Sequence, residues 1–402
     1  MKKLTILVSA INAVGHSFEG KLKKLGYEEY VYSIDREQPT NVENKPDDTK
    51  IENPGERMAQ LLLKSKIIGP SSPLEKMEQF LTFFEDPLQR NEYKHQNRGA
   101  KEAIDQFNPD LIFVDTSLVP VIYYSNIPWI KCISTTPNFF FDDSTLPPPG
   151  SGLPINDNTD WHLFEKFRRE FTNSTPLANL IKELGYEPYP DNITFPETQL
   201  LTVYAYPNEL NWNQIRQKDW FNLEFVEDSL NNKWSGKWIY VSMGSMGSVD
   251  LDLMKRLISA LQNTPHKYIV SKGPRHEELE LAANMYGERY LPQTKIVPLV
   301  DLVITHGGNN TTTETFAVGK PMIVFPLFGD QFDNAQRLEE TGLGARLEPY
   351  GFTEKQLTDK IDHFLNDQAV LEKLQNASKR IMNSNKPEEL AIKLEQLLCK
   401  DN

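Results

Sequence analysis

The sequence is poor in cysteine, with two thiols, Cys132 and Cys399, among 402 residues. Two cysteines are too few for a disulfide framework or for a cysteine-ligated zinc cluster. We therefore expect both to be reduced thiols in a cytoplasmic protein.

Long apolar runs and an excess of positive charge are also missing. No stretch approaches the roughly 18 uninterrupted apolar residues that a membrane-spanning helix needs. The N-terminal MKKLTILVSA begins like a secretory signal, but its apolar run stops at Asn12, so we expect the first strand of a βα fold. With 43 basic against 56 acidic residues the net charge is −13, which disfavours nucleic acid and anionic membranes as partners. We expect no membrane anchor.

Two nucleotide-binding signatures are absent as well. The sequence contains no G-x-x-x-x-G-K-[ST], which excludes a P-loop, and no G-x-G-x-x-G follows the first expected strand, which disfavours a nicotinamide cofactor.

The most informative stretch is residues 301–334. A buried strand is expected at Asp301–Thr305 and another at Met322–Phe325, each followed by a loop and a helix. The residues Asn309–Thr311 offer helix N-caps. Polar residues therefore gather at the carboxyl ends of the strands, where open parallel sheets bind ligands.

The same alternation of strands and helices extends over the whole chain and predicts two successive α/β halves. The first begins with a strand at Leu4–Ser9, and the second opens with a strand at Trp238–Val241. Residues 207–237 between them have weak periodicity and are expected to connect the two halves. A helix is expected at Glu277–Asn284.

Three loops of the second half, 244–248, 306–310 and 328–331, would lie along one rim of the sheet. Glycines, a histidine and a helix N-terminus suit a diphosphate, and nearby acids suit sugar hydroxyls. Each residue also has a simpler explanation. Glu314 could complete a capping box with Thr311, Asp330 could be an N-cap, and His306 could be a loop histidine with a backbone partner.

Aromatic residues form two further groups. Met77, Phe80, Leu81 and Phe84 recur at helical spacing, which is typical of a core-facing stripe, with a substrate wall as the alternative. The consecutive aromatics of 139–141 cannot all face one side, so we expect some of them to serve a ligand or a mobile flap.

One family matches these motifs. The run HGGNNTTTE…GKPMIVFPLFGDQFDNAQRL, together with VSMGS and YLPQ, resembles UDP-glycosyltransferases that act on small acceptors, in particular the soluble mite and bacterial-type members. The resemblance implies the GT-B fold, an α/β fold with two Rossmann-like doubly wound parallel-sheet domains facing each other across a cleft. It implies an acceptor domain at 1–210, a linker at 211–236, a UDP-sugar domain at 237–385 and a helix at 386–402 crossing back to the first domain.

The resemblance also implies roles for individual residues. His306 would contact the diphosphate, Glu314 the ribose, and Asp330 with Gln331 the transferred sugar. Tyr290 stands where the family often has a tryptophan stacked on uracil. The full set of implied donor-binding residues is Gly244, Ser245, Tyr290, Gln293, His306, Gly308, Asn310, Thr311, Glu314, Asp330 and Gln331.

The expected catalytic base is His16, in the loop after the first strand. An imidazole with a pKa near neutrality can take the acceptor proton, and Asp115, at the end of another strand, would orient it. A solvated loop histidine and a loop-capping aspartate are the alternatives. The family continues after this histidine with a helix and a second strand, whereas here Ser17 follows directly. Either the chain is trimmed or residues are absent between the two, and we favour the second.

These expectations add up to an inverting, metal-independent enzyme without a cofactor. It would transfer a sugar, expected to be glucose, from a UDP-sugar to a small lipophilic acceptor, as in the detoxification of xenobiotics or plant phenolics, and would be a monomer. The expected acceptor wall comprises Met77, Phe80, Phe84, Phe139 and Phe140. A non-catalytic nucleotide-sugar-binding subunit and a UDP-sugar epimerase are the alternatives.

Overall fold

The structure is a computed structural model, and it describes residues 6–9, 28, 54–81, 87–115, 118–141, 143–198, 200–212, 219–224 and 237–398. His16 and Phe84 lie outside these ranges. Within them, no helix combines the length and the apolarity that crossing a membrane requires.

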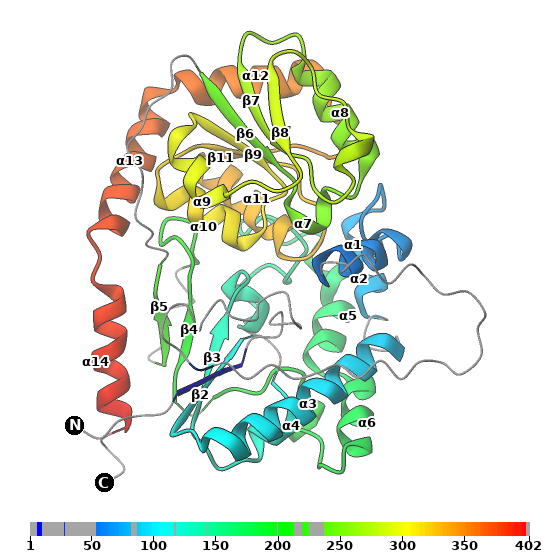
Figure 1. The fold of residues 1–402 in the computed structure, drawn as a ribbon, viewed down its shortest axis with the longest axis vertical. Coiled ribbons are helices and arrows are strands. Elements are labelled where there is room, and N and C mark those ends of the chain that lie inside the picture. The colour runs from blue at the N-terminus through cyan, green and yellow to red at the C-terminus, as the bar shows by residue number, and fades with distance from the viewer. Residues whose placement is uncertain are drawn as a thin grey trace. The chain divides into compact units, whose positions relative to one another are not determined.

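The elements before residue 225 are β1 (Ile6–Ser9), α1 (Pro54–Lys64), α2 (Pro73–Leu81), α3 (Pro87–Phe107), β2 (Leu111–Asp115), α4 (Pro120–Tyr123), β3 (Trp129–Ile133), the 3₁₀ turn η4 (Pro137–Phe140), α5 (Trp161–Thr172), α6 (Thr175–Glu183), β4 (Thr202–Tyr204) and β5 (Trp220–Asn222). Most of them are labelled in Figure 1.

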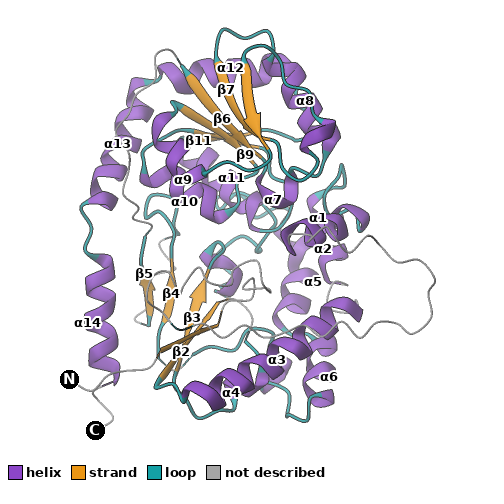
Figure 2. Cartoon of the chain, in the orientation of Figure 1, coloured by secondary structure: helices purple, strands orange, loops and turns teal. Residues whose placement is uncertain are grey.

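The elements after residue 236 are β6 (Trp238–Ser242), α7 (Gly244–Gly247), α8 (Leu251–Leu261), β7 (Lys267–Ser271), β8 (Met285–Glu288), α9 (Gln293–Ile296), β9 (Leu302–Thr305), α10 (Asn309–Ala317), β10 (Met322–Val324), α11 (Asp330–Thr341), β11 (Gly344–Arg346), α12 (Glu354–Asn366), α13 (Gln368–Met382) and α14 (Lys386–Leu398). Strands and helices largely alternate from β6 to α12. Figure 2 colours the strands orange and the helices purple.

Two compact units make up the chain. The first comprises Met1–Met58, Leu81–Cys132 and Glu170–Thr202, and the second Ala59–Phe80, Ile133–Arg169 and Val203–Asn402. The consecutive domain ranges implied by the family resemblance, 1–210 and 237–385, stay a prediction. The structure adds that two segments of the N-terminal half, 59–80 and 133–169, make their main contacts with the C-terminal part of the chain.

The first sheet has the strand order β1-β2-β3-β4-β5, and β2 runs parallel to both β1 and β3. Its strands are short apolar runs. Inside the first unit, α3, α4 and α6 cover β2 through a core that includes Tyr93, Ile112, Ile122 and Leu180. Burial of this core holds Asp115 at the carboxyl end of β2.

The second sheet is parallel throughout, with the order β11-β10-β9-β6-β7-β8. With β6 counted as strand 1, the order across the sheet is 6-5-4-1-2-3, the doubly wound order. The order in which strands are added to the sheet reverses between β6 and β9. Strand residues such as Ile239, Val303 and Ile323 are fully buried, as expected for a sheet covered on both faces.

Sequence patterns missed the edge strands of this sheet. A helix was expected at Glu277–Asn284, but that prediction is wrong, because the segment is a 3₁₀ turn leading into β8. The Asn284 side chain donates to the carbonyls of Leu261, Thr264 and His266, which fixes the chain beside β7. Short strands such as β8 and β11 carry too few residues for a periodic signal.

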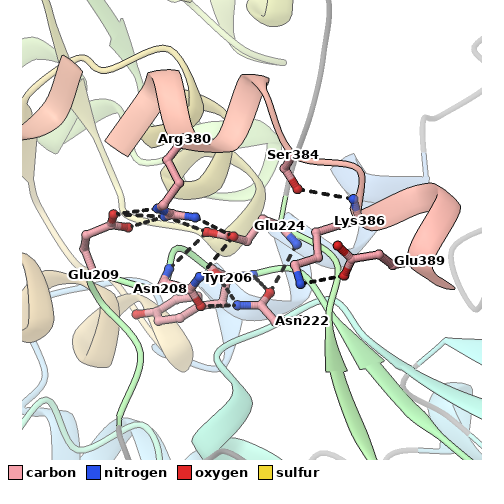
Figure 3. Close-up of polar contacts among 9 residues, drawn as sticks. All are labelled: Tyr206, Asn208, Glu209, Asn222, Glu224, Arg380, Ser384, Lys386 and Glu389. Atoms are coloured by element: carbon pink, nitrogen blue, oxygen red, sulfur yellow. Dashed lines mark hydrogen bonds and ion pairs between the residues drawn. The ribbon is translucent and has the colours of Figure 1, made fainter. Parts of the chain in front are cut away.

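The C-terminal helices of the second unit are held by charge as well as by packing. A capping box between Thr353 and Gln356 starts α12. Near the end of α13, the guanidinium of Arg380 bonds to the carboxylates of Glu209 and Glu224, as Figure 3 shows. Glu224 is 3% exposed, and Arg380 is its cationic partner.

Candidate functional site

The candidate site lies in the second unit, where the strand order reverses between β6 and β9. In the register of these strands Ser242 is paired with Thr305, so their carboxyl ends lie side by side. The chain leaves β6 into the short helix α7 and leaves β9 into the loop His306-Gly307-Gly308. This is the switch point at which doubly wound sheets bind ligands.

The His306 ring is enclosed by two glycines. A Cβ atom added to Gly244 would stand 2.6 Å from His306 Cε1, and one added to Gly308 would stand 2.5 Å from Nε2. Gly244 also has a φ of +69°, which favours glycine. Both glycines are thus required for the ring to occupy this position at the rim of the sheet.

Burial fixes the protonation state of His306. It lowers the pKa of the imidazole to about 4, and a hydrogen bond with the Ser242 backbone opposes this only in part. The Nδ1 atom lies 3.2 Å from the Thr305 hydroxyl. His306 therefore has the backbone partner that the simpler explanation proposed, and near pH 7 it is a neutral hydrogen-bonding group instead of a fixed cation.

The N-terminus of α10 supplies backbone donors next to this ring. N-caps were expected among Asn309–Thr311, but Gly308 takes the N-cap position and brings no side chain to satisfy the first-turn N–H groups. Asn334 donates to the Gly307 carbonyl at 2.8 Å and so fixes the loop. Such a helix start binds anions, because its N–H groups and its dipole both favour negative charge.

A hydrogen-bonded cluster lies one helical turn further along α10. The Gln293 amide donates to Glu314 Oε2 at 2.6 Å and to Thr311 Oγ1 at 3.1 Å. The capping-box explanation of Glu314 is wrong, since Thr311 is the third residue inside the helix and not its N-cap. The structure thus brings together three predicted donor-binding residues on two elements, α9 and α10.

Tyr290 and Ser245 present exposed groups close to these elements in the sequence. Tyr290 is 43% exposed, with the Arg289 guanidinium 5.3 Å above its ring, and it precedes α9 by three residues. Ser245 lies on α7 and is also exposed, as is Asn310 on α10. These side chains are accessible to a ligand.

The structure contradicts the simpler explanation of Asp330 as a helix N-cap. Gly329, with a φ of +59°, is the N-cap of α11, so Asp330 is the first helical residue and not the cap. Its carboxylate accepts hydrogen bonds from the Thr135 side chain and the Thr136 backbone. Burial and the neighbouring Asp333 raise its pKa to about 7.

Gln331 is 2% exposed, and its side chain turns back on its own loop. Its Oε1 atom accepts from the backbone N–H groups of Leu327 at 2.9 Å and Phe328 at 3.2 Å. The side-chain oxygen of Gln331 is therefore engaged in shaping the loop after β10.

Asp333 is a residue that the sequence analysis missed. Its carboxylate accepts from Asn138 Nδ2 at 3.0 Å and from the backbone N–H groups of Gly150 and Gly152 at 2.7 and 2.9 Å. Burial raises its pKa to about 6. The sequence signal that could have identified Asp333 is its spacing from Asp330, i and i+3 on one helix face. Its hydrogen-bond partners could not be predicted, because they lie more than 180 residues away in the sequence.

Two of the expected acceptor-wall residues meet in the second unit. A Cβ atom on Gly150 would lie 3.1 Å from Phe139 Cζ, 3.5 Å from Met77 Cε and 3.6 Å from the Gly329 carbonyl. Phe140 is buried, Phe80 is half-buried, and Phe141 packs edge-on against Trp220. The segment 139–141, expected in part as a flap, thus packs within this unit.

Asp115, the expected partner of the catalytic base, belongs to the other unit. Asp115 ends β2, as expected, and is half-buried beside Cys132. Strand β1 ends at Ser9, which is paired with Val114, so the chain leaves β1 next to Asp115. His16 lies beyond β1, outside the described residues, and its role stays a prediction.

The fold is shared by glycosyltransferases of known structure. The calicheamicin glycosyltransferase CalG4 superposes with a TM-score of 0.64 at 17% identity, covering all of this chain and 99% of that protein. The glycosyltransferase of kitacinnamycin gives a TM-score of 0.65 at 15% identity over 98% of this chain and all of that protein. The chain has the GT-B fold of these enzymes.

Sequence comparison leads from the fold class to the family. Residues 222–389 match the family model described as "UDP-glucoronosyl and UDP-glucosyl transferase". UDP-glucuronosyltransferase 1A6 of Homo sapiens is 33% identical over 323 residues, which are 70% of this chain and 59% of the human protein. Sterol 3-beta-glucosyltransferase of Candida albicans is 28% identical over 202 residues, 48% of this chain and 13% of that enzyme.

Residues 222–389 hold every predicted donor-binding residue, and this segment is a domain of the UDP-glycosyltransferase family. The chain spans 13% of the Candida relative and 45% of the NDP-glycosyltransferase YjiC of Bacillus subtilis, to which it is 28% identical over 177 residues.

Proposed function

We propose that the protein transfers a sugar from a UDP-sugar to a hydroxyl group of a small lipophilic acceptor, with inversion at the anomeric carbon and without a metal ion. The observation that carries the proposal is the arrangement at the switch point. The His306 ring lies in the loop that leads from β9 into α10, and the Gln293–Glu314 pair joins α9 to α10. The His306 ring and the start of α10 suit the diphosphate of a nucleotide. The Gln293–Glu314 pair suits its ribose.

The chemistry of leaving-group departure follows from these groups. As the bond from the sugar to the diphosphate breaks, negative charge grows on the phosphate oxygens. Backbone N–H groups at the start of α10 and a neutral His306 donor are preorganised for that charge, and such groups stabilise it without reorganising. We assign glucose as the sugar, with glucuronate as the alternative, since relatives carry both names.

The expected acceptor wall includes Met77 and Phe139, which meet around Gly150 in the second unit. His16 is assigned as the base that takes the acceptor proton, and Asp115 as the group that orients it. The attacking oxygen would approach from the face opposite the diphosphate, in one displacement. Conjugation of xenobiotics or plant phenolics is the physiological role that we assign.

The test is transfer from UDP-glucose and UDP-glucuronate to a panel of flavonoids, simple phenols and sterols, with products identified by mass spectrometry. The expected result is a β-linked conjugate from an α-linked donor, formed equally well with a chelator present. His16→Ala should abolish transfer and leave UDP binding intact. A product of the same anomeric configuration as the donor, or full activity of His16→Ala, would overturn the assignment.

A further inference from the structure

Helix α2 places a buried lysine against the loop that follows β10. Lys76 is 4% exposed, and its ammonium donates to the Leu327 carbonyl at 2.7 Å. The rings of Phe332 and Tyr350 each lie 5.7 Å from Nζ. The lysine thus reaches a loop that is 251 residues away in the sequence.

The same loop is held from its other side by Gln331. Because the N–H groups of Leu327 and Phe328 donate to Gln331 Oε1 and the Leu327 carbonyl accepts from Lys76, the backbone polar groups at the bend are fixed. The Leu327 side chain is fully buried. The residues that come next, Gly329 and Asp330, are therefore presented in one conformation at the start of α11.

The buried charge is costly, which argues for a function beyond packing. Burial lowers the pKa of Lys76 to about 8, while the charges of Glu348 and Asp250 favour the ammonium. Tyr350 donates to Asp250 Oδ2 at 2.6 Å and completes this environment. An apolar side chain of similar length would fill the space between the two rings without the cost of desolvation.

We propose that Lys76 is a positioning residue for the donor sugar: it holds the Leu327–Asp330 loop in the conformation that receives the sugar, and thereby couples helix α2 to donor binding. The inference rests on the proposed function and on the family resemblance, which implies that Asp330 and Gln331 contact the transferred sugar. The residue after Lys76, Met77, lies with Phe139 and Gly329 around Gly150. One turn of α2 thus touches both the sugar loop and the expected acceptor wall.

This role predicts a selective effect. The groups assigned to the diphosphate and ribose, His306 and Glu314, lie in the loop after β9 and on α10, whereas Lys76 bonds to the loop after β10. Loss of the lysine should therefore weaken recognition of the sugar and leave recognition of UDP unchanged.

The experiment compares Lys76→Met and Lys76→Arg with Lys355→Met, which removes a lysine whose side chain is 82% exposed. Binding of UDP and of UDP-glucose is measured by calorimetry, and kinetic constants by product formation. In Lys76→Met we expect KM for UDP-glucose to rise roughly tenfold, because one charge-assisted hydrogen bond is lost. The Kd for UDP should stay within about twofold of the wild-type value. Lys76→Arg should recover part of the loss. Equal weakening of UDP and UDP-glucose, or no change in either, would overturn the proposal.

A second measurement is independent of catalysis. Amide hydrogen exchange in the peptide that covers residues 327–332 should accelerate in Lys76→Met without ligand, because the Leu327 and Phe328 amides lose their fixed geometry. Unchanged exchange contradicts the proposal even in an inactive protein. If the wild-type protein transfers no sugar while exchange does accelerate, the proposed function fails and the hold of Lys76 on the loop stands.

Discussion

The carboxylate of Asp333 accepts a hydrogen bond from the backbone N–H of Gly150 at a distance of 2.7 Å. This bond joins helix α11, whose first residue is a predicted sugar ligand, to the proline-rich segment that follows the aromatic run 139–141. With Asn138 and Gly152 as further donors, the carboxylate fastens that segment to the helix. The expected acceptor-wall residue Phe139 is thus held against the same helix that carries Asp330.

Asp333→Asn should destabilise the second unit. An asparagine keeps one acceptor oxygen and turns an NH₂ group toward donors that the carboxylate now satisfies. We expect a loss of about 2 to 4 kcal/mol in the free energy of unfolding, measured by urea denaturation. Asp359→Asn, on the exposed face of α12, is the control and should change stability by less than about 0.5 kcal/mol. Equal stability of the two variants would show that the Asp333 bonds are weak.

Asp330 should make stability depend on pH. An aspartate in the unfolded chain ionises near pH 3.8, whereas the pKa of folded Asp330 is raised to about 7. Between these values the native state holds a proton that the unfolded state has lost, so stability falls as the pH rises through this window. The Tm of wild type, relative to that of Asp330→Asn, should therefore fall from pH 4 to pH 8. A constant or rising difference would mean that the carboxyl group is ionised throughout.

The position of His306 can be tested through Gly308, which has a φ of −60° and no backbone strain against alanine. In Gly308→Ala the new methyl group would stand 2.5 Å from His306 Nε2, so the ring must move. We expect UDP binding to weaken roughly tenfold by calorimetry. Gly351→Ala is the control, since its Cβ would lie 3.5 Å from Glu348 Cβ, an ordinary contact. If Gly308→Ala bound UDP with wild-type affinity, His306 would not be a ligand of the diphosphate.

Glu314 can be tested by pairing a substitution with a changed ligand. If its carboxylate accepts from a ribose hydroxyl, wild type should bind UDP about tenfold more tightly than 2′-deoxy-UDP, and Glu314→Ala should show little preference. Glu372→Ala, on the exposed face of α13, should keep the wild-type preference. An unchanged ratio of the two affinities in Glu314→Ala would mean that the carboxylate does not bind the ribose.

Arg380→Gln should weaken the attachment of α13 to residues 209–224. It leaves the buried carboxylate of Glu224 without its cationic partner, at a cost of about 2 to 3 kcal/mol given that Arg380 is itself 39% exposed. Thermal and urea unfolding would measure it, with Lys355→Gln as a matched loss of an exposed ion pair. If the unfolding transitions of the two variants coincided, the Glu224 carboxylate would be stabilised by other groups in Arg380→Gln.

The strand ends of the second unit were predictable because their signals are local. Apolar runs of four or five residues, ended by glycine and polar residues, identified β6, β9 and β10 and the loops after them. The predicted start of α10 was wrong by only a few residues. Asn309 and Thr311 are residue types that favour the N-cap position, and only the backbone conformation shows that Gly308 occupies it. The edge strands were missed because β8 and β11 are too short for a periodic signal.

What the sequence determined by itself was the set of groups available for chemistry: two glycines around a histidine, a glutamate on the following helix, and acids at the start of another. The tertiary structure alone decided how those groups are engaged. It neutralises His306 by burial, turns Gln331 back onto its own loop, and assigns Asp333 to Gly150 and Lys76 to Leu327. The physical reason is that hydrogen bonds and burial depend on neighbours in space, and these partners lie 183 and 251 residues apart in the sequence.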